Sequence, residues 1–140
     1  MSEIEFCPLP ELCQPLLDKF YRAQRSPMRS SGATQFWVAK RQAIIGALCL
    51  TQVADGYWLT GLFVAPEWRR QGVAERLITS AMRDLAGPVW LFCHPDLIGF
   101  YERSGFALAA DLPSALADKL VRYRRTKELV GMVGATNCSN

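Results

Sequence analysis

The chain has 140 residues, a formal net charge of +3 at pH 7 and a hydrophobic content of 50%. This balance is typical of one folded domain and excludes a disordered or fibrous chain. The small charge excess does not by itself indicate nucleic-acid binding, although it suits an anionic ligand. We expect the basic cluster within residues 119–127 to be the solvated face of a helix rather than a nucleic-acid surface.

The cysteines and the single histidine limit the kinds of disulfide and metal site that the chain can form. Five cysteines at irregular spacing argue against a disulfide framework, and we expect Cys49 and Cys93 to be buried as small hydrophobic residues. With His94 as the one histidine and no C-x-x-C pair, the sequence predicts no metal site. It shows neither a secretory signal nor a run of about 20 apolar residues, so we expect a cytoplasmic protein that is not in a membrane.

Hydrophobic periodicity predicts the elements of the first half of the chain. We expect a helix at 11–24, with Leu12, Leu16, Leu17 and Phe20 on its buried face, and an exposed loop at 26–34. Asp55-Gly56 is a hairpin signal. The predicted strands are residues 4–7, 35–39, 43–53 and 57–64.

In the second half the pattern becomes that of alternating helices and strands. A helix is predicted from Gly72 to the Gly87-Pro88 stop signal, and further helices at 95–104 and 112–126. Strands are predicted at 89–93, 106–109 and 129–133. The unit 57–93 should form a right-handed parallel crossover, so the fold class is α/β, a mixed central sheet of about seven strands flanked by helices.

The segment 62–74 carries the most chemical information. A predicted buried strand runs into a loop with Arg69 and Arg70, and a helix follows directly after Gly72. The first amides of a helix have no partner within it, and the helix dipole adds positive potential, so such a turn attracts anions. A glycine lets a phosphate approach the backbone closely. The sequence therefore predicts a phosphate site, without either of the two common nucleotide-binding signatures.

Two motifs make the chain resemble the GNAT superfamily of acyl-CoA-dependent N-acyltransferases. Its signature, [Gln/Arg]-x-x-Gly-x-[Gly/Ala] after a strand ending Val-x-Pro, is matched by residues 64–66 and 69–74. Its Tyr-x-x-x-Gly-Phe element is matched by residues 101–106. The resemblance implies the GNAT fold, with the fourth and fifth strands splayed apart to admit the pantetheine arm of acetyl-CoA.

The resemblance also implies the roles of single residues. Tyr101 would be the general acid for the departing thiolate. The backbone of the fourth strand would bind the pantetheine arm, and the amides of the following turn would bind the pyrophosphate. The residues that would contact acetyl-CoA are Leu62, Phe63, Val64, Arg69, Arg70, Gln71, Gly72, Val73 and Ala74.

The acceptor side is less determined by the sequence. The general base stays open between Glu67, Asp55, Asp96 and His94, the last of which replaces an asparagine common in the family. Trp58 and Trp68 are the tryptophans most suited to line an acceptor pocket. The helix at 112–126 lies between two strands that form a hairpin in the commonest family layout.

The sequence as a whole predicts one GNAT domain over residues 1–134 and a polar C-terminal tail over 135–140. The expected function is transfer of an acetyl group from acetyl-CoA to a primary amine of an unidentified acceptor by direct attack. A non-catalytic acyl-CoA-binding regulatory protein of the same fold is the alternative. A homodimer is plausible from the resemblance.

Overall fold

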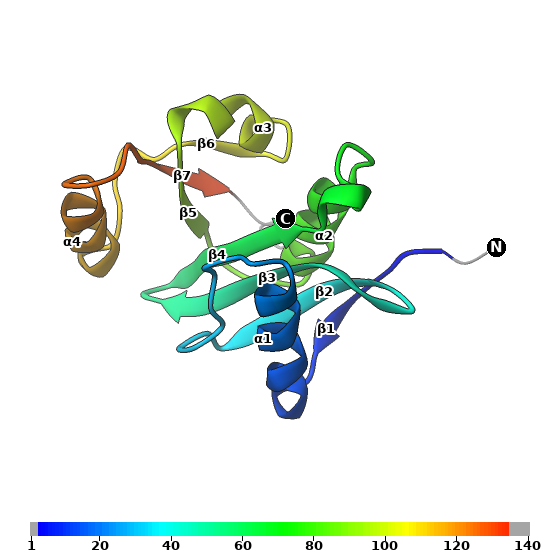
Figure 1. The fold of residues 1–140 in the computed structure, drawn as a ribbon. Coiled ribbons are helices and arrows are strands. Elements are labelled where there is room, and N and C mark those ends of the chain that lie inside the picture. Colours follow the sequence, from blue (N-terminus) through cyan, green and yellow to red (C-terminus); the bar gives the residue numbers. More distant parts are fainter. Residues whose placement is uncertain (1–2, 135–140) are drawn as a thin grey trace. The chain divides into compact units, whose positions relative to one another are not determined.

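The computed structural model describes residues 3–134, and the predicted tail lies outside these residues. The chain divides into two compact units (Figure 1). The first runs to Thr51 and continues from Leu59 to Arg83, and the second contains Gln52–Trp58 and the chain from Asp84 onward. The single domain boundary at residue 134 stays a prediction.

The predicted order of strands and helices is confirmed. Across residues 3–134 the elements are β1 (Glu5–Leu9), α1 (Gln14–Ala23), β2 (Gln35–Arg41), β3 (Ala43–Val53), β4 (Gly56–Val64), α2 (Val73–Met82), β5 (Val89–Cys93), α3 (Ile98–Glu102), β6 (Phe106–Leu108), α4 (Ser114–Tyr123) and β7 (Val130–Gly134). Single 3₁₀ turns at Glu11–Cys13, Pro66–Trp68 and Pro95–Leu97 precede α1, α2 and α3. Among the described helices, none is long and apolar enough to cross a membrane.

The strands form one mixed sheet with the hydrogen-bonding order β1-β2-β3-β4-β5-β7-β6. The pairs β1–β2, β2–β3, β5–β7 and β6–β7 are antiparallel. β4 and β5 are parallel, as predicted, with Tyr57 opposite Val89 and Trp58 opposite Trp90. The hairpin signal before β4 is also confirmed, although the left-handed residue of the turn is Ala54 (φ 51°) rather than Gly56.

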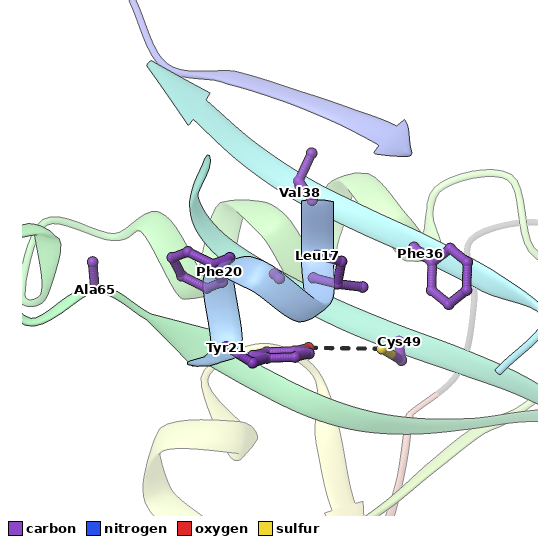
Figure 2. Close-up of a cluster of buried hydrophobic side chains, with 8 residues drawn as sticks. Leu17, Phe20, Tyr21, Phe36, Val38, Cys49 and Ala65 are labelled. Atoms are coloured by element: carbon purple, nitrogen blue, oxygen red, sulfur yellow. Dashed lines mark hydrogen bonds between the residues drawn. The ribbon is translucent and has the colours of Figure 1, made fainter. Parts of the chain in front are cut away.

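In the first unit, α1 covers one face of the strands with a narrower apolar stripe than the sequence indicates. Leu17, Phe20 and Tyr21 of α1 are buried, and they form a cluster with residues of β2 and β3 (Figure 2). Leu12 is 95% exposed and Leu16 is 53% exposed, so their prediction as core residues is wrong. Leu12 lies in the preceding 3₁₀ turn, whose three-residue period moves it off the stripe of the α-helix.

The opposite face of the same strands packs against α2. Ala39, Ile45 and Val64 cluster with Val73, the first residue of that helix. Val38 belongs to the α1 cluster and its neighbour Ala39 to this one, because successive strand residues point to opposite faces. The central residues of β2 and β3 are therefore buried on both faces, which explains the continuous apolar run of β3 in the sequence.

The second unit contains the departure from the commonest family layout that the sequence indicated. α4 lies between β6 and β7 in the chain, and these two strands still pair in an antiparallel register. Leu116 and Leu120 of α4 are buried. A Cβ at Gly131 of β7 would lie 3.2 Å from a methyl group of Leu112 and 3.6 Å from one of Leu120. The glycine thus lets the α4 segment pack directly on the strand.

The loop at 26–34 was predicted to be exposed, and this is wrong for Ser30. Ser30 is 0% exposed. Its hydroxyl donates to Asp18 Oδ1 at 2.6 Å and accepts from Gln14 Nε2 at 2.8 Å, so both partners come from α1. A single small residue with both hydrogen-bonding functions satisfied therefore pins the loop to the helix.

Replacing Ser30 with Ala should destabilise the protein, because it leaves the partly buried Gln14 amide without its acceptor and Asp18 without its donor. We expect the free energy of unfolding to fall by about 1–3 kcal/mol. Chemical denaturation measures this change. The neighbouring Ser31 is exposed, so Ser31→Ala is the matched control and should change stability by less than about 0.5 kcal/mol. Equal effects of the two substitutions would contradict the pinning role.

Candidate active site

The turn between β4 and α2 is built by a short series of backbone hydrogen bonds. Pro66 opens a 3₁₀ turn, in which the amide of Trp68 donates to the Ala65 carbonyl at 2.8 Å. The amide of Arg69 donates to the Pro66 carbonyl at 3.2 Å. The Arg69 amide is thus hydrogen-bonded within the turn, and the amides that are free to bind a ligand begin after Arg69.

Two left-handed residues then turn the backbone into the helix. Arg70 has φ 65° and Gly72, the N-cap of α2, has φ 77°. The first backbone bond of the helix runs from the Arg76 amide to the Gly72 carbonyl at 3.0 Å. The amides of Val73, Ala74 and Glu75 precede that bond and have no acceptor in the helical ladder. Alternating backbone handedness with unpaired amides forms a concave anion-binding site.

The geometry at Gly72 explains why a glycine is required there. A Cβ on Gly72 would meet nothing within 4 Å, so packing does not exclude a side chain. The positive φ is the local reason for glycine, and the open space is what a close ligand needs. Arg70 adopts a comparable φ with a side chain, which costs on the order of 1 kcal/mol, and such strain concentrates at functional sites.

The side chains of the turn are only partly free. Arg69 Nε donates to the Val64 carbonyl at 2.8 Å, and its guanidinium lies 5.0 Å from the centre of the Phe63 ring. Gln71 Nε2 donates to the Glu67 carbonyl at 3.2 Å. Arg70 is exposed. The side chains of Arg69 and Gln71 therefore stabilise the turn and the end of β4, and Arg70 is the arginine more available to an anion.

Tyr101 lies in α3, in the second unit, within a group of aromatic rings. It is 8% exposed, and its ring makes edge-on contacts with Phe100 and Phe106 at centroid distances of 5.0 and 5.9 Å. Burial, and to a lesser degree the nearby Cys93, raises the pKa of Tyr101 to about 12. The phenol is therefore protonated at neutral pH, as a proton donor must be. Cys93 itself is buried, as predicted.

His94 acts as a cap in this structure. Its Nδ1 accepts from the Asp96 amide at 3.1 Å, and its Nε2 lies 3.5 Å from Glu128 Oε1. Nδ1 also lies 3.5 Å from Asp96 Oδ2. Both ring nitrogens thus have neighbours within the unit, and this favours the capping alternative. Asp55, Glu67 and Asp96 are all exposed.

The two tryptophans considered for the acceptor side differ in their surroundings. Trp68 packs against both apolar clusters of the first unit and carries the Arg41 guanidinium 5.3 Å from its ring centre. Trp58 packs against Phe92 at 5.4 Å, with the Lys119 ammonium 5.5 Å from its ring. Its indole Nε1 is buried and has no hydrogen-bond partner among the described residues. The contacts of Trp68 favour a packing role, whereas Trp58 keeps an unused donor, and lining of an acceptor pocket by either stays a prediction.

Features that sequence reasoning missed lie around α1. A cavity of about 400 Å³ opens between the helix and the 26–34 loop, lined by Asp18, Arg22, Met28, Arg29 and Ser31. In addition, Tyr21 donates from its hydroxyl to the carbonyl of Gly61 in β4 at 2.6 Å. A glycine in the middle of an apolar strand is a signal of a bulge, and it could have drawn attention to this position. Among residues 3–134, no cluster of metal-ligating side chains is found.

The family is decided by a comparison with family models. The model described as an acetyltransferase (GNAT) domain matches residues 32–108, more than half of the chain. The chain belongs to the GNAT acetyltransferase family. The matched stretch includes both segments on which the resemblance was based, the turn before α2 and the residues around Tyr101. No curated protein sequence matches the chain.

Solved structures confirm the GNAT fold. A putative N-acetyltransferase from Lactobacillus plantarum superposes with a TM-score of 0.71 at 14% identity, covering 96% of this chain and 99% of that one. The GNAT-family N-acetyltransferase YhbS from Escherichia coli, solved with CoA, has a TM-score of 0.67 at 19% identity, covering 96% and 82%. N-acetylglutamate synthase from Neisseria gonorrhoeae, solved with CoA and N-acetyl-glutamate, has a TM-score of 0.69 at 16% identity, covering 98% and 36%.

The environment of Tyr101 can be tested by titration. An unfolded tyrosine titrates near pH 10, so the raised pKa means that folding favours the protonated phenol. This stabilising contribution should be complete below about pH 10 and lost as the pH rises through about 12. Carbon-13 NMR of labelled tyrosine should show a midpoint near 12, with Tyr101→Phe identifying the signal. A midpoint at or below 10 would contradict the buried site.

Cys93→Ala is the second variant for this titration. Burial is the larger cause of the shift and Cys93 the smaller. The variant should therefore lower the pKa of Tyr101 only slightly. A return to the ordinary tyrosine value would mean that the thiolate, not burial, holds the proton on Tyr101.

Proposed function

We propose that this protein is an N-acetyltransferase that moves an acetyl group from acetyl-CoA to a primary amine. The observation that carries the proposal is the turn before α2, where the amides of Val73, Ala74 and Glu75 precede the first helical hydrogen bond. Membership of the family and the CoA in two structural relatives support it. Diphosphate groups need several converging amides in an uncrowded turn, which this segment provides.

The proposed binding mode follows the chain from β4 into α2. The backbone of Leu62, Phe63 and Val64 would pair with the amides of the pantetheine arm. The amides from Arg70 to Ala74 would hold the pyrophosphate, with the exposed Arg70 side chain adding charge. Arg69 would act through its side chain at the end of β4, because its own amide is bonded within the turn.

The proposed chemistry needs no covalent enzyme intermediate. Acetyl-CoA supplies the acyl group as a thioester, and the neutral amine attacks its carbonyl carbon while the carbon–sulfur bond breaks. A backbone amide near Phe63 or Val64 would donate to the carbonyl oxygen as it gains negative charge. The Tyr101 hydroxyl would give its proton to the departing sulfur. The proton of the attacking amine would pass to solvent, and the Tyr101 phenolate would regain a proton from solvent. Glu67, Asp55 and Asp96 are exposed carboxylates, and none is assigned as the base.

The proposed function includes the cellular compartment and the acceptor of the enzyme. The four cysteines that the structure describes are free thiols, which suits a reducing compartment such as the cytoplasm. The acceptor is a small or macromolecular amine, and the cavity beside α1 is a place where its specificity can arise. A homodimer stays a prediction from the family resemblance.

Release of free CoA separates the enzyme from a non-catalytic acyl-CoA-binding regulator. Both bind acetyl-CoA, but the enzyme alone releases thiol when amines are supplied. Against wild-type protein, Tyr101→Phe should lower turnover by about 10²–10⁴-fold, the usual contribution of a positioned acid, with a much smaller change in acetyl-CoA affinity. A thiol-release assay across amine classes and calorimetric titration measure the two quantities. Equal loss in both, or no loss in turnover, would remove the general-acid role from Tyr101.

The pyrophosphate placement can be tested at Gly72. Replacing Gly72 with Leu puts a side chain into the open space at the turn, so acetyl-CoA affinity should fall at least tenfold. Gly32→Leu is the matched control, because Gly32 has φ +83° and also meets nothing within 4 Å. The control carries the same backbone strain and should bind acetyl-CoA normally. Unchanged affinity in the Gly72 variant would place the pyrophosphate elsewhere.

A further inference from the structure

Tyr21 is a buried polar residue that joins α1 to β4. Its side chain is 1% exposed, within the cluster drawn in Figure 2. The hydroxyl donates to the Gly61 carbonyl at 2.6 Å and lies 3.7 Å from Cys49 Sγ on β3. Burying a phenol hydroxyl in an apolar cluster costs free energy unless the hydroxyl is hydrogen-bonded. The hydroxyl of Tyr21 therefore has a structural role beyond filling space.

The partner of Tyr21 is an irregular residue within β4. Gly61 has the left-handed φ of +66°, although β4 continues beyond it to Val64. A left-handed residue within a strand bends the backbone and turns a carbonyl away from the ladder. Here the Gly61 carbonyl accepts a hydrogen bond from the hydroxyl of Tyr21 in α1. A Cβ on Gly61 would lie 2.7 Å from the Tyr21 hydroxyl oxygen, so the contact also requires glycine.

The segment directly after this kink is held at both ends. Tyr21 fixes its start at Gly61, and Arg69 Nε fixes its end by donating to the Val64 carbonyl at 2.8 Å. Between them, the Phe63 ring packs edge-on against Phe20 of α1 at a centroid distance of 6.1 Å. Contacts from α1 and from the turn before α2 therefore fix the direction in which the amides and carbonyls of residues 62–64 point.

We propose that Tyr21 is a positioning residue that orients the β4 segment Leu62–Val64 for the pantetheine arm and thioester of acetyl-CoA. This inference rests on the proposed function. Tyr21 does not touch the reacting atoms and acts through the Gly61 carbonyl. An enzyme gains most when the groups that meet a developing charge are already oriented before the ligand binds, and the hydrogen bond from Tyr21 supplies that order.

The protonation states around Tyr21 keep this hydrogen bond in place. Burial is the largest cause that raises the pKa of the Tyr21 hydroxyl far above its ordinary value. Burial likewise raises the pKa of the Cys49 thiol, to about 11. Asp18 is the charged group that contributes at both sites, and its negative charge raises both pKa values. Both hydroxyl and thiol are thus neutral at physiological pH, and Tyr21 remains a donor to Gly61.

Tyr21→Phe tests the proposal, because it removes the hydroxyl and keeps the ring that packs 5.9 Å from Phe20. We expect amide hydrogen exchange within residues 62–64 to become on the order of tenfold faster. Acetyl-CoA affinity should fall by a similar factor. The 3′-phosphorylated ADP half of CoA should bind the variant and wild type equally, since it reaches only the turn before α2.

The control and a second variant keep the outcome clear. Tyr123→Phe makes the same change on a half-buried tyrosine of α4, whose ring packs 6.1 Å from Phe92, and it should change none of these quantities. Gly61→Ala breaks the same contact from the other side and should reproduce the loss of acetyl-CoA affinity. Its effect should not add to that of Tyr21→Phe in the double variant.

The results separate this inference from the proposed function. If wild-type protein does not bind acetyl-CoA, the proposed function fails, whereas hydrogen exchange still reports whether Tyr21 orders residues 62–64. If Tyr21→Phe leaves that exchange unchanged, or weakens acetyl-CoA and its nucleotide half equally, the positioning role is wrong. Faster exchange confined to this segment, with loss of affinity for acetyl-CoA alone, supports it.

Discussion

The proposed acetyl-CoA site depends on backbone amides that have no partners among the described residues at the start of α2. The 3₁₀ turn uses the amides of Trp68 and Arg69, and the helical ladder begins only at Arg76. The amides in between meet the positive end of the helix dipole, so the turn carries a favourable field for an anion before any side chain contributes. This arrangement requires left-handed backbone at Arg70 and Gly72, and the strain is part of what defines the site.

The surrounding residues hold the backbone more than they offer charge. The Arg69 side chain donates to the Val64 carbonyl, and the Gln71 side chain donates to the Glu67 carbonyl. Tyr21 of α1 donates to the Gly61 carbonyl in β4. Each of these donors satisfies an acceptor that the irregular backbone turns away from regular structure. The common result is a strand end and a turn whose polar groups have fixed directions, which is what recognition of a polar cofactor arm requires.

Sequence reasoning succeeded where local chemistry determines structure. The β3 and β5 runs and the left-handed Gly105 after α3 follow from periodicity and backbone preference. The predicted helix stop at Gly87-Pro88 is wrong, since α2 already ends at Met82. Sequence reasoning also failed where partners distant in the chain decide. Ser30 is buried because α1 supplies two partners, and Leu12 is exposed because a 3₁₀ turn changes its direction. The motif located Tyr101, whereas its burial depends on Phe106 and other packing that no pattern of spacing reveals.

The insertion of α4 between the last two strands has a consequence for how the second unit assembles. β7 lies between β5 and β6 in the sheet, although it comes after both along the chain. Until β7 docks, each of these strands has an open edge on the side that β7 will occupy. Closing them requires contacts over a long sequence separation, which slows folding and exposes apolar strand edges in the meantime. The strand made last thus completes the centre of its unit, and intermediates that lack it are the species most prone to pair with another chain.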